Sequence, residues 1–166
     1  MRNLFSKAVF VFLFTATQAI AAILPQDSLL CEGDQQLAVL KKAGINNLGG
    51  EAQLKEASLH LQFNELRGKN AKVLSDLAVS EELIRGNRFG GSSSARAVDA
   101  KSGLDSANAE ADNLRTVINT CAASGPEQLP VEIIKQLPIS GATQVRVKFK
   151  GAIADLWTNS RIISNP

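Results

Sequence analysis

Two long stretches of the sequence repeat apolar residues at alternating steps of three and four. The first covers residues 51–84, and its apolar ladder consists of Ala52, Leu59, Phe63, Leu66, Val73, Leu77 and Ile84. The second covers residues 95–123, and its ladder consists of Ala97, Ala100, Leu104, Ala107, Ala111, Leu114, Ile118 and Cys121. A spacing of about 3.5 residues places apolar side chains on one stripe of a helix. The pattern therefore predicts two long helices that pack through these seams as in a coiled coil.

The segment between the two ladders, "RGNRFGGSSS" at residues 85–94, is the clearest loop in the chain. Its glycines end one helix, and its serines suit the start of the next. A short connection favours an antiparallel helical hairpin. We expect large residues of the first ladder, such as Leu59 and Phe63, to fill the space beside the alanines of the second. The sequence leaves open whether the hairpin projects alone or belongs to a compact bundle.

The segments that flank the hairpin are shorter. Residues 27–43 predict a short N-terminal helix, which the glycines and asparagines of residues 44–50 end. Residues 131–137 predict another short helix, beginning at Pro130. In residues 144–150, the apolar residues Val145, Val147 and Phe149 alternate with polar or basic ones, which predicts a strand with one buried face.

The fold class expected from these elements is mainly α, with a small C-terminal β or mixed segment. Residues 152–157 are either the hairpin partner of the predicted strand or a short helix. The sequence has no Tyr and one Trp, so the core must come from Leu, Ile, Val and Ala, which favours helix packing on helix. Residues 22–123 would form a helical domain with its hairpin at 51–123, and residues 124–166 a linker and a small α/β segment packed on the helices.

The first 21 residues have the pattern of an export signal. Arg2 and Lys7 precede an apolar run, and Ala19-Ile20-Ala21 matches the small-x-small motif before a cleavage site. We expect cleavage after Ala21 and no stable membrane span in the mature protein. The alternative is an uncleaved anchor, although about 17 apolar residues lie at the lower limit for crossing a bilayer.

Two cysteines, Cys31 and Cys121, are the only ones in the chain. In an exported protein an even number of cysteines indicates a disulfide, and one intrachain pairing exists. The alternative is two buried free thiols. Together with His60, the single histidine, these groups are too few and too dispersed for a closed zinc site.

The charge of the mature chain excludes an obvious nucleic-acid partner. The full chain carries 18 basic and 16 acidic residues, and loss of Arg2 and Lys7 leaves it near neutral. Nucleic-acid binding usually needs a strongly basic surface, so we predict a protein partner instead.

Motifs for catalysis are missing from the sequence. His60 lies at the edge of the first ladder, no Gly-x-Ser-x-Gly elbow exists, and "RFGGSSSAR" lacks the lysine of a phosphate-binding loop. We predict no catalytic residues and no cofactor. The alternative is a small exported hydrolase, or an inhibitor of an exported enzyme.

Two groups of residues are candidates for binding a partner. An aromatic among arginines suits a docking anchor, and the first group, at the hairpin tip, consists of Arg85, Arg88, Phe89 and Arg96. The second, in the basic C-terminal tail, consists of Arg146, Lys148, Lys150 and Trp157. The sequence thus predicts a periplasmic or secreted interaction protein, an accessory or subunit of a cell-envelope assembly.

Overall fold

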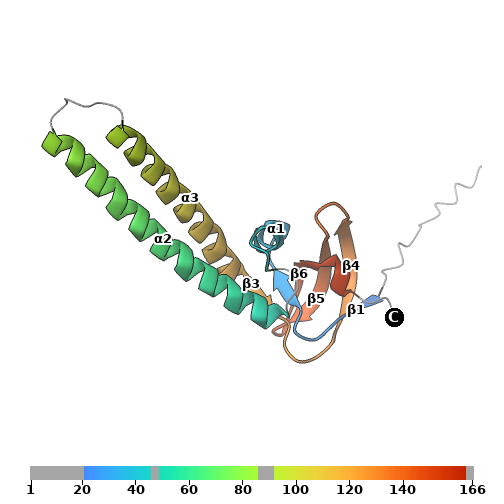
Figure 1. Cartoon of the computed structure of the whole chain (residues 1–166). Coiled ribbons are helices and arrows are strands. Elements are labelled where there is room, and N and C mark those ends of the chain that lie inside the picture. Colours follow the sequence, from blue (N-terminus) through green and yellow to red (C-terminus); the bar gives the residue numbers. More distant parts are fainter. Residues whose placement is uncertain (1–20, 46–48, 86–91, 164–166) are drawn as a thin grey trace, which may run out of the picture.

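A computed structural model of the chain describes residues 21–45, 49–85 and 92–163 (Figure 1). The helices are α1 (Asp34–Lys42), α2 (Gly50–Arg85), α3 (Ser92–Thr120) and the short 3-10 helix η1 (Ser160–Ile162). The strands are β1 (Ala21–Leu24), β2 (Leu29–Cys31), β3 (Cys121–Ala123), β4 (Leu129–Leu137), β5 (Ala142–Phe149) and β6 (Ala152–Asn159). The proposed signal segment before residue 21 lies outside the described residues.

The predicted fold class, mainly α, is wrong. The described strands form one six-stranded antiparallel sheet in the order β1-β4-β5-β6-β2-β3. The sheet combines segments that precede and follow the helical hairpin in the sequence: β1 and β2 come before the hairpin, and the other strands come after it. Three of these strands have only three or four residues, too few to show an alternating pattern.

The segment 131–137, predicted as a short helix, is a strand within β4 instead. Its β-branched residues Val131, Ile133 and Ile134 favour a pleated, half-buried surface over a helix. Val131 is buried directly opposite Val147 of β5. The long-range pairing with β5 therefore decides the structure of this segment.

The strand predicted at residues 144–150 is confirmed as β5, and β6 is its hairpin partner. The turn between them consists of Lys150 and Gly151, which both have positive φ angles, of 50° and 83°. Positive φ at two successive residues is the conformation that joins tightly twisted strands. Of the two structures left open for residues 152–157, the strand is present.

Residues 27–43, predicted as one helix, divide into β2 and α1. Cys31 consequently lies in a strand, directly opposite Cys121 of β3, with 4.1 Å between their Cα atoms. The predicted disulfide between them is confirmed. It joins two neighbouring strands where the hairpin meets the sheet, and does not clamp a helix to a helix.

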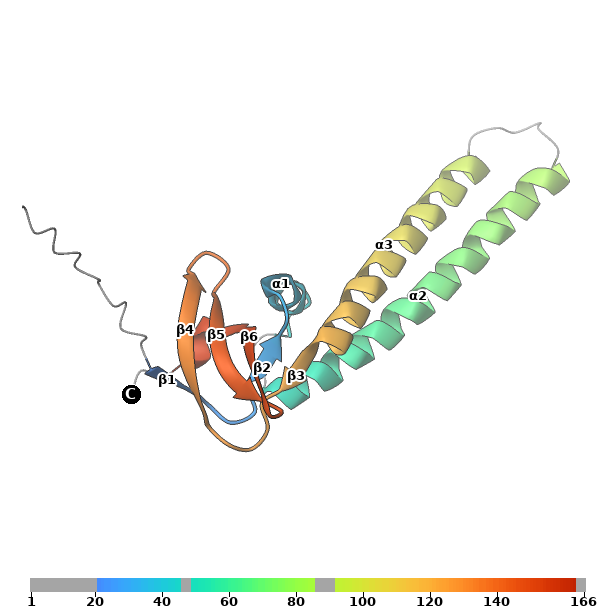
Figure 2. The same cartoon turned by 180° about the vertical axis from the view of Figure 1, so that it is seen from behind.

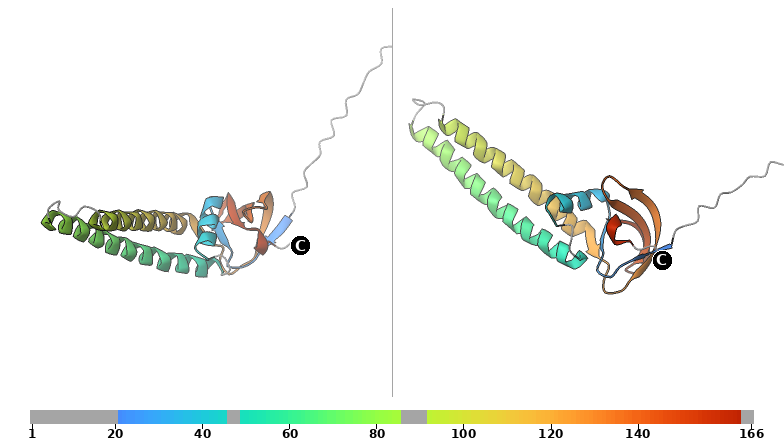
Figure 3. Two further views of the ribbon diagram at one scale, coloured as in Figure 1. Left: turned by 45° about the horizontal axis from the view of Figure 1, so that its top comes forward. Right: turned by 45° about the vertical axis from the view of Figure 1, so that its right-hand side comes forward.

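Helices α2 and α3 run antiparallel and project from the sheet (Figures 1 and 2). The sheet lies at one end of the hairpin in both further views, with α1 beside the point of attachment (Figure 3). Of the two arrangements that the sequence left open, the structure has the projecting hairpin.

The hairpin packs through small residues on both helices. On α3 the predicted seam is confirmed where Ala107, Ala111 and Leu114 are buried. The seam predicted for α2 is wrong: the residues that α2 buries are mostly small or polar, namely Gln53, Ala57, Asn64, Gly68 and Ala78. A Cβ atom added to Gly68 would lie 3.2 Å from Asn108 Oδ1, so the two backbones approach closely here. At Gly68 the space between the helices is too small for a large side chain.

Two buried clusters hold the base together. The first joins the hairpin, α1 and one face of the sheet, and includes Leu29, Leu40 and Val117. The second lies on the sheet itself and includes Leu30, Val131 and Val145. Leu29 and Leu30 belong to different clusters because successive residues of a strand point to opposite faces. The hairpin is therefore fixed to the sheet at its base and extends freely beyond it.

Candidate functional site

Most of the exposed large apolar side chains of the described structure lie on α2. Six of these side chains on α2 are each at least half exposed. We call the surface that they form the outer face; it consists of Leu59, Phe63, Leu66, Val73, Leu74 and Leu77. Five of these six belong to the ladder that the sequence assigned to the interior of the hairpin.

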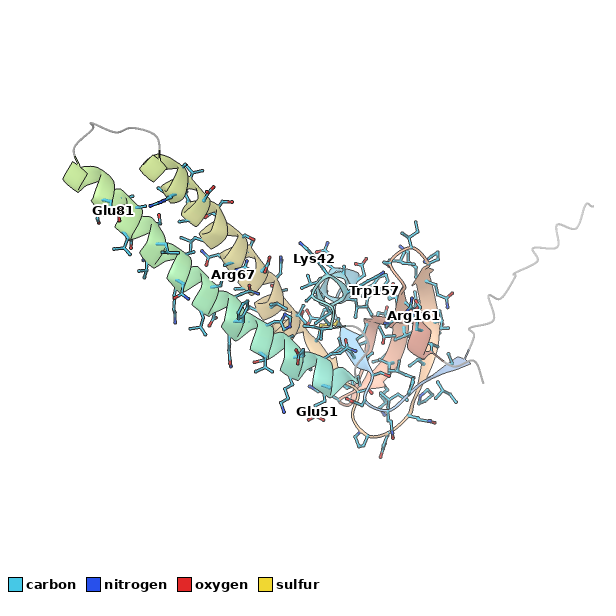
Figure 4. All side chains as sticks on the ribbon, in the orientation of Figure 1. Lys42, Glu51, Arg67, Glu81, Trp157 and Arg161 are labelled. Carbon is cyan, nitrogen blue, oxygen red and sulfur yellow. A yellow bond between two sulfur atoms is a disulfide. The ribbon has the colours of Figure 1, made fainter. Side chains whose placement is uncertain are left out.

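The rotation of α2 about its axis explains this exposure. At about 100° per residue, the ladder from Leu59 to Leu77 and the buried positions such as Ala57 and Gly68 fall on opposite sides of one helix. Ion pairs across the hairpin hold that rotation: Arg67 Nη2 lies 3.4 Å from Glu110 Oε2 (Arg67 is labelled in Figure 4), and Arg115 Nη2 lies 2.9 Å from Glu65 Oε1. The outer face consequently points to solvent along most of the hairpin.

Charged residues border the outer face. Lys69 and Asp76 are both exposed, and neither takes part in an ion pair with another described residue. Asn70 interrupts the apolar ladder near its middle and is exposed as well. An apolar stripe with polar borders and one polar residue within it is the composition of a helix-pairing surface.

The candidate residues at the hairpin tip can be placed only in part. Arg88 and Phe89 lie outside the described residues, as does the side chain of Arg85, which ends α2. Arg96 is exposed in the first turns of α3. Binding through the tip stays a prediction.

The basic residues of the tail differ in their surroundings. Arg146 donates hydrogen bonds of 2.9 and 3.0 Å to the two carboxylate oxygens of Asp155, and its Nη1 lies 3.6 Å from Glu132 Oε2. These acids are its register partners on β6 and β4. The hydrogen bonds and charge of Asp155, followed by the charge of Glu132, raise the pKa of Arg146. Two carboxylates thus neutralise this cation, and it offers little charge to a partner.

Lys148 and Lys150 are exposed, and Lys150 Nζ lies 5.2 Å from the ring centre of Phe149. Trp157 is half-buried and lies in register with Cys31 on the neighbouring strand β2. Figure 4 places Trp157 near α1, at the side of the sheet where the hairpin is attached. The strand register places Trp157 opposite Gln144, and therefore on the same face of the sheet as Arg146 and Lys148, while Lys150 lies in the turn between β5 and β6. Binding through these four residues stays a prediction.

His60 lines a cavity of about 180 Å³ between α1, α2 and α3 together with Asn64, Glu110 and Leu114. Its Nε2 atom lies 3.6 Å from Glu56 Oε1 on the same helix, and about two fifths of its side chain is exposed. Among the described residues, its lining holds no serine, threonine or cysteine beside the imidazole.

A second cavity, of about 680 Å³, lies between α1 and the turn that joins β4 to β5. Its described lining holds Ser140 and Ser160 but no histidine or carboxylate that would activate a hydroxyl. Within the part of the chain that the structure describes, no three side chains of His, Cys, Asp or Glu gather as metal ligands. The outer face of α2 is therefore the best-supported site.

The described helices include none with the length and apolar character needed to cross a membrane. No protein family, curated protein or solved structure matches this chain in sequence or fold.

Proposed function

We propose that the protein is an exported, non-catalytic interaction protein that binds a partner helix along the outer face of α2. The observation that carries the proposal is the exposure of a regular three–four ladder on a helix whose other side is already occupied by α3. Side chains that repeat with this period pack best against a second helix with the same period. The expected partner is therefore helical.

The area of the outer face supports a binding role. Six side chains that each expose about 100 Å² give roughly 600 Å² of apolar surface, at the upper end of what a monomeric protein leaves open to water. Covering that surface would stabilise a complex through the hydrophobic effect. The fold itself does not use the surface, because α1 and the sheet lie at the base of the hairpin.

Export is the second part of the proposal. A disulfide persists in oxidising compartments, and Cys31 and Cys121 form one. The charged start, the apolar run and the Ala19-Ile20-Ala21 motif supply a route to such a compartment. The proposed setting is the periplasm or the exterior of the cell, with a role as an accessory or subunit of an envelope assembly. The mass of the protein isolated from producing cells tests cleavage of the signal segment, and a chain that still holds residues 1–21 would favour the uncleaved anchor. Free thiols at Cys31 and Cys121 in freshly isolated protein would argue against export.

A photo-reactive phenylalanine at position 63 tests the binding site in producing cells. We expect light-dependent covalent adducts at this position, since Phe63 lies in the middle of the outer face. The matched control carries the same residue at Val98, which is equally exposed but lies on α3. Adducts at Val98 and none at Phe63 would place the binding site elsewhere.

A further inference from the structure

We infer that the partner of the outer face is a second copy of this chain, paired antiparallel with Leu66 of one copy opposite Leu77 of the other. This inference rests on the proposed function and names the occupant of the same surface. It follows from the order of apolar, polar and charged residues along α2, which is complementary to itself in one alignment.

An antiparallel pair of identical helices is related by a twofold axis. In this alignment the axis lies beside the middle of the ladder, between Asn70 and Val73. With Leu66 opposite Leu77 of the second copy, Val73 lies opposite Asn70, and Phe63 lies opposite Ser80. Each apolar residue is then covered by the helix of the other copy. Antiparallel pairing also places the two sheets at opposite ends of the assembly, because each sheet lies at the base of its own hairpin (Figure 1).

The charges that border the ladder select this alignment. Lys69 of each copy lies beside Asp76 of the other, which gives two ion pairs between groups that have no ion-pair partner among the described residues of their own chain. A shift of one heptad in either direction brings Lys69 beside Lys69, or Asp76 beside Asp76. Like charges at such positions oppose pairing.

Parallel pairing is less favourable for the same reasons. It would place Asp76 of one copy beside Glu81 of the other, and it would bring both sheets to the same end. Asn70 would face Asn70, the one contact that favours the parallel form. Two repulsions between carboxylates and the crowding of the sheets outweigh that contact.

The buried area is sufficient for a stable pair. Two outer faces of roughly 600 Å² each give about 1,200 Å², the lower end of the range of specific protein interfaces. Unlike most such interfaces, this one would be dominated by apolar side chains, as expected for a pair of like chains.

Two variants of the mature, oxidised protein that each carry one added cysteine, Leu66→Cys and Leu77→Cys, test both the partner and the direction of pairing. We expect a disulfide-linked dimer when the two variants are mixed and mildly oxidised, and none when either is oxidised alone. Mass analysis of the linked peptides must show residue 66 joined to residue 77, with Cys31 still bonded to Cys121. Val98→Cys, exposed on α3, is the matched control and should not form a link.

The remaining outcomes overturn the inference in different ways. Linkage of Leu66→Cys to itself would show parallel pairing and reject the alignment. If no sample forms a link, the second copy is rejected as the partner. If no link forms but position 63 gives light-dependent adducts with another protein, the proposed function is retained. If no link and no adducts form, both the proposed function and the pairing of two copies are rejected.

Discussion

Phe63 and Asn64 are neighbours on α2 with environments opposite to those that their chemistry suggests. Phe63 is 62 % exposed, whereas Asn64 is 5 % exposed against α1 and α3. The Oδ1 atom of Asn64 has no hydrogen-bond partner among the described residues. Burial of an unpaired amide oxygen costs stability, as does the exposure of an aromatic ring to water. A second helix that covers Phe63 would remove the second of these costs.

The replacement Phe63→Ala tests the exposure of the outer face. It should lower the free energy of unfolding of the dilute, monomeric protein by less than about 1 kcal/mol, as for other exposed sites. Leu114→Ala, at a buried position of α3, should cost about 2–5 kcal/mol. Urea titrations followed by the fluorescence of Trp157, the single tryptophan, measure both. A loss of about 3–5 kcal/mol for Phe63→Ala would show instead that the ring is buried.

Close packing of the hairpin predicts that α3 tolerates a larger side chain at Ala109 but not at Ala107. Ala107 is buried against α2, and Ala109 is exposed. Ala107→Leu should destabilise the protein by about 1–3 kcal/mol because the helices must separate, while Ala109→Leu should change stability by less than about 0.5 kcal/mol. Thermal unfolding compares the two, and equal effects would contradict the described contact between the helices.

The disulfide closes a loop between residues 90 positions apart. The double replacement Cys31→Ala and Cys121→Ala should lower the free energy of unfolding by about 4 kcal/mol, mainly because the unfolded chain gains freedom. Urea titration of the oxidised wild type and the variant measures this difference. If the two proteins unfold at the same urea concentration, the bond does not constrain the chain in this way.

Exchange of two charges tests the pairing alignment. Lys69→Asp replaces both proposed ion pairs of a dimer by repulsions and should weaken association about tenfold, given 0.2–1 kcal/mol per exposed pair. Asp76→Lys should act similarly. The variant with both changes should recover most of the wild-type affinity, because its charges remain opposite. Dissociation constants from sedimentation decide this, and effects that simply add in the double variant would reject the contact between Lys69 and Asp76.

The sequence was sufficient to place the two long helices, since their periodicity extends over many turns. It also led to the correct disulfide, because only two cysteines exist. The orientation of α2 was not predictable from its ladder alone: a stripe with Leu59 and Leu66 indicates that something covers it but not what. The alanines and glycines that face α3, such as Ala57 and Gly68, were the overlooked signal.

The sheet was missed for a different physical reason. Strands such as β2 and β3 are defined by partners about 90 residues away, and three residues carry no recognisable period. In β4 a register shift occurs between Ile133 and Lys135, and it interrupts the alternation that would have indicated a strand. Short strands of this kind become visible only when the whole sheet is assembled.

If α2 directs its apolar ladder away from its own hairpin and toward a second copy, the protein forms a dimer. Sedimentation equilibrium of the mature wild-type protein, beside the double variant Leu66→Glu and Leu77→Glu, tests it most directly. We expect a wild-type mass of two chains in the micromolar range. For the variant we expect one chain, with unchanged helix content and an intact disulfide. A wild type that has the mass of one chain at every concentration, or a variant that fails to fold, would contradict it.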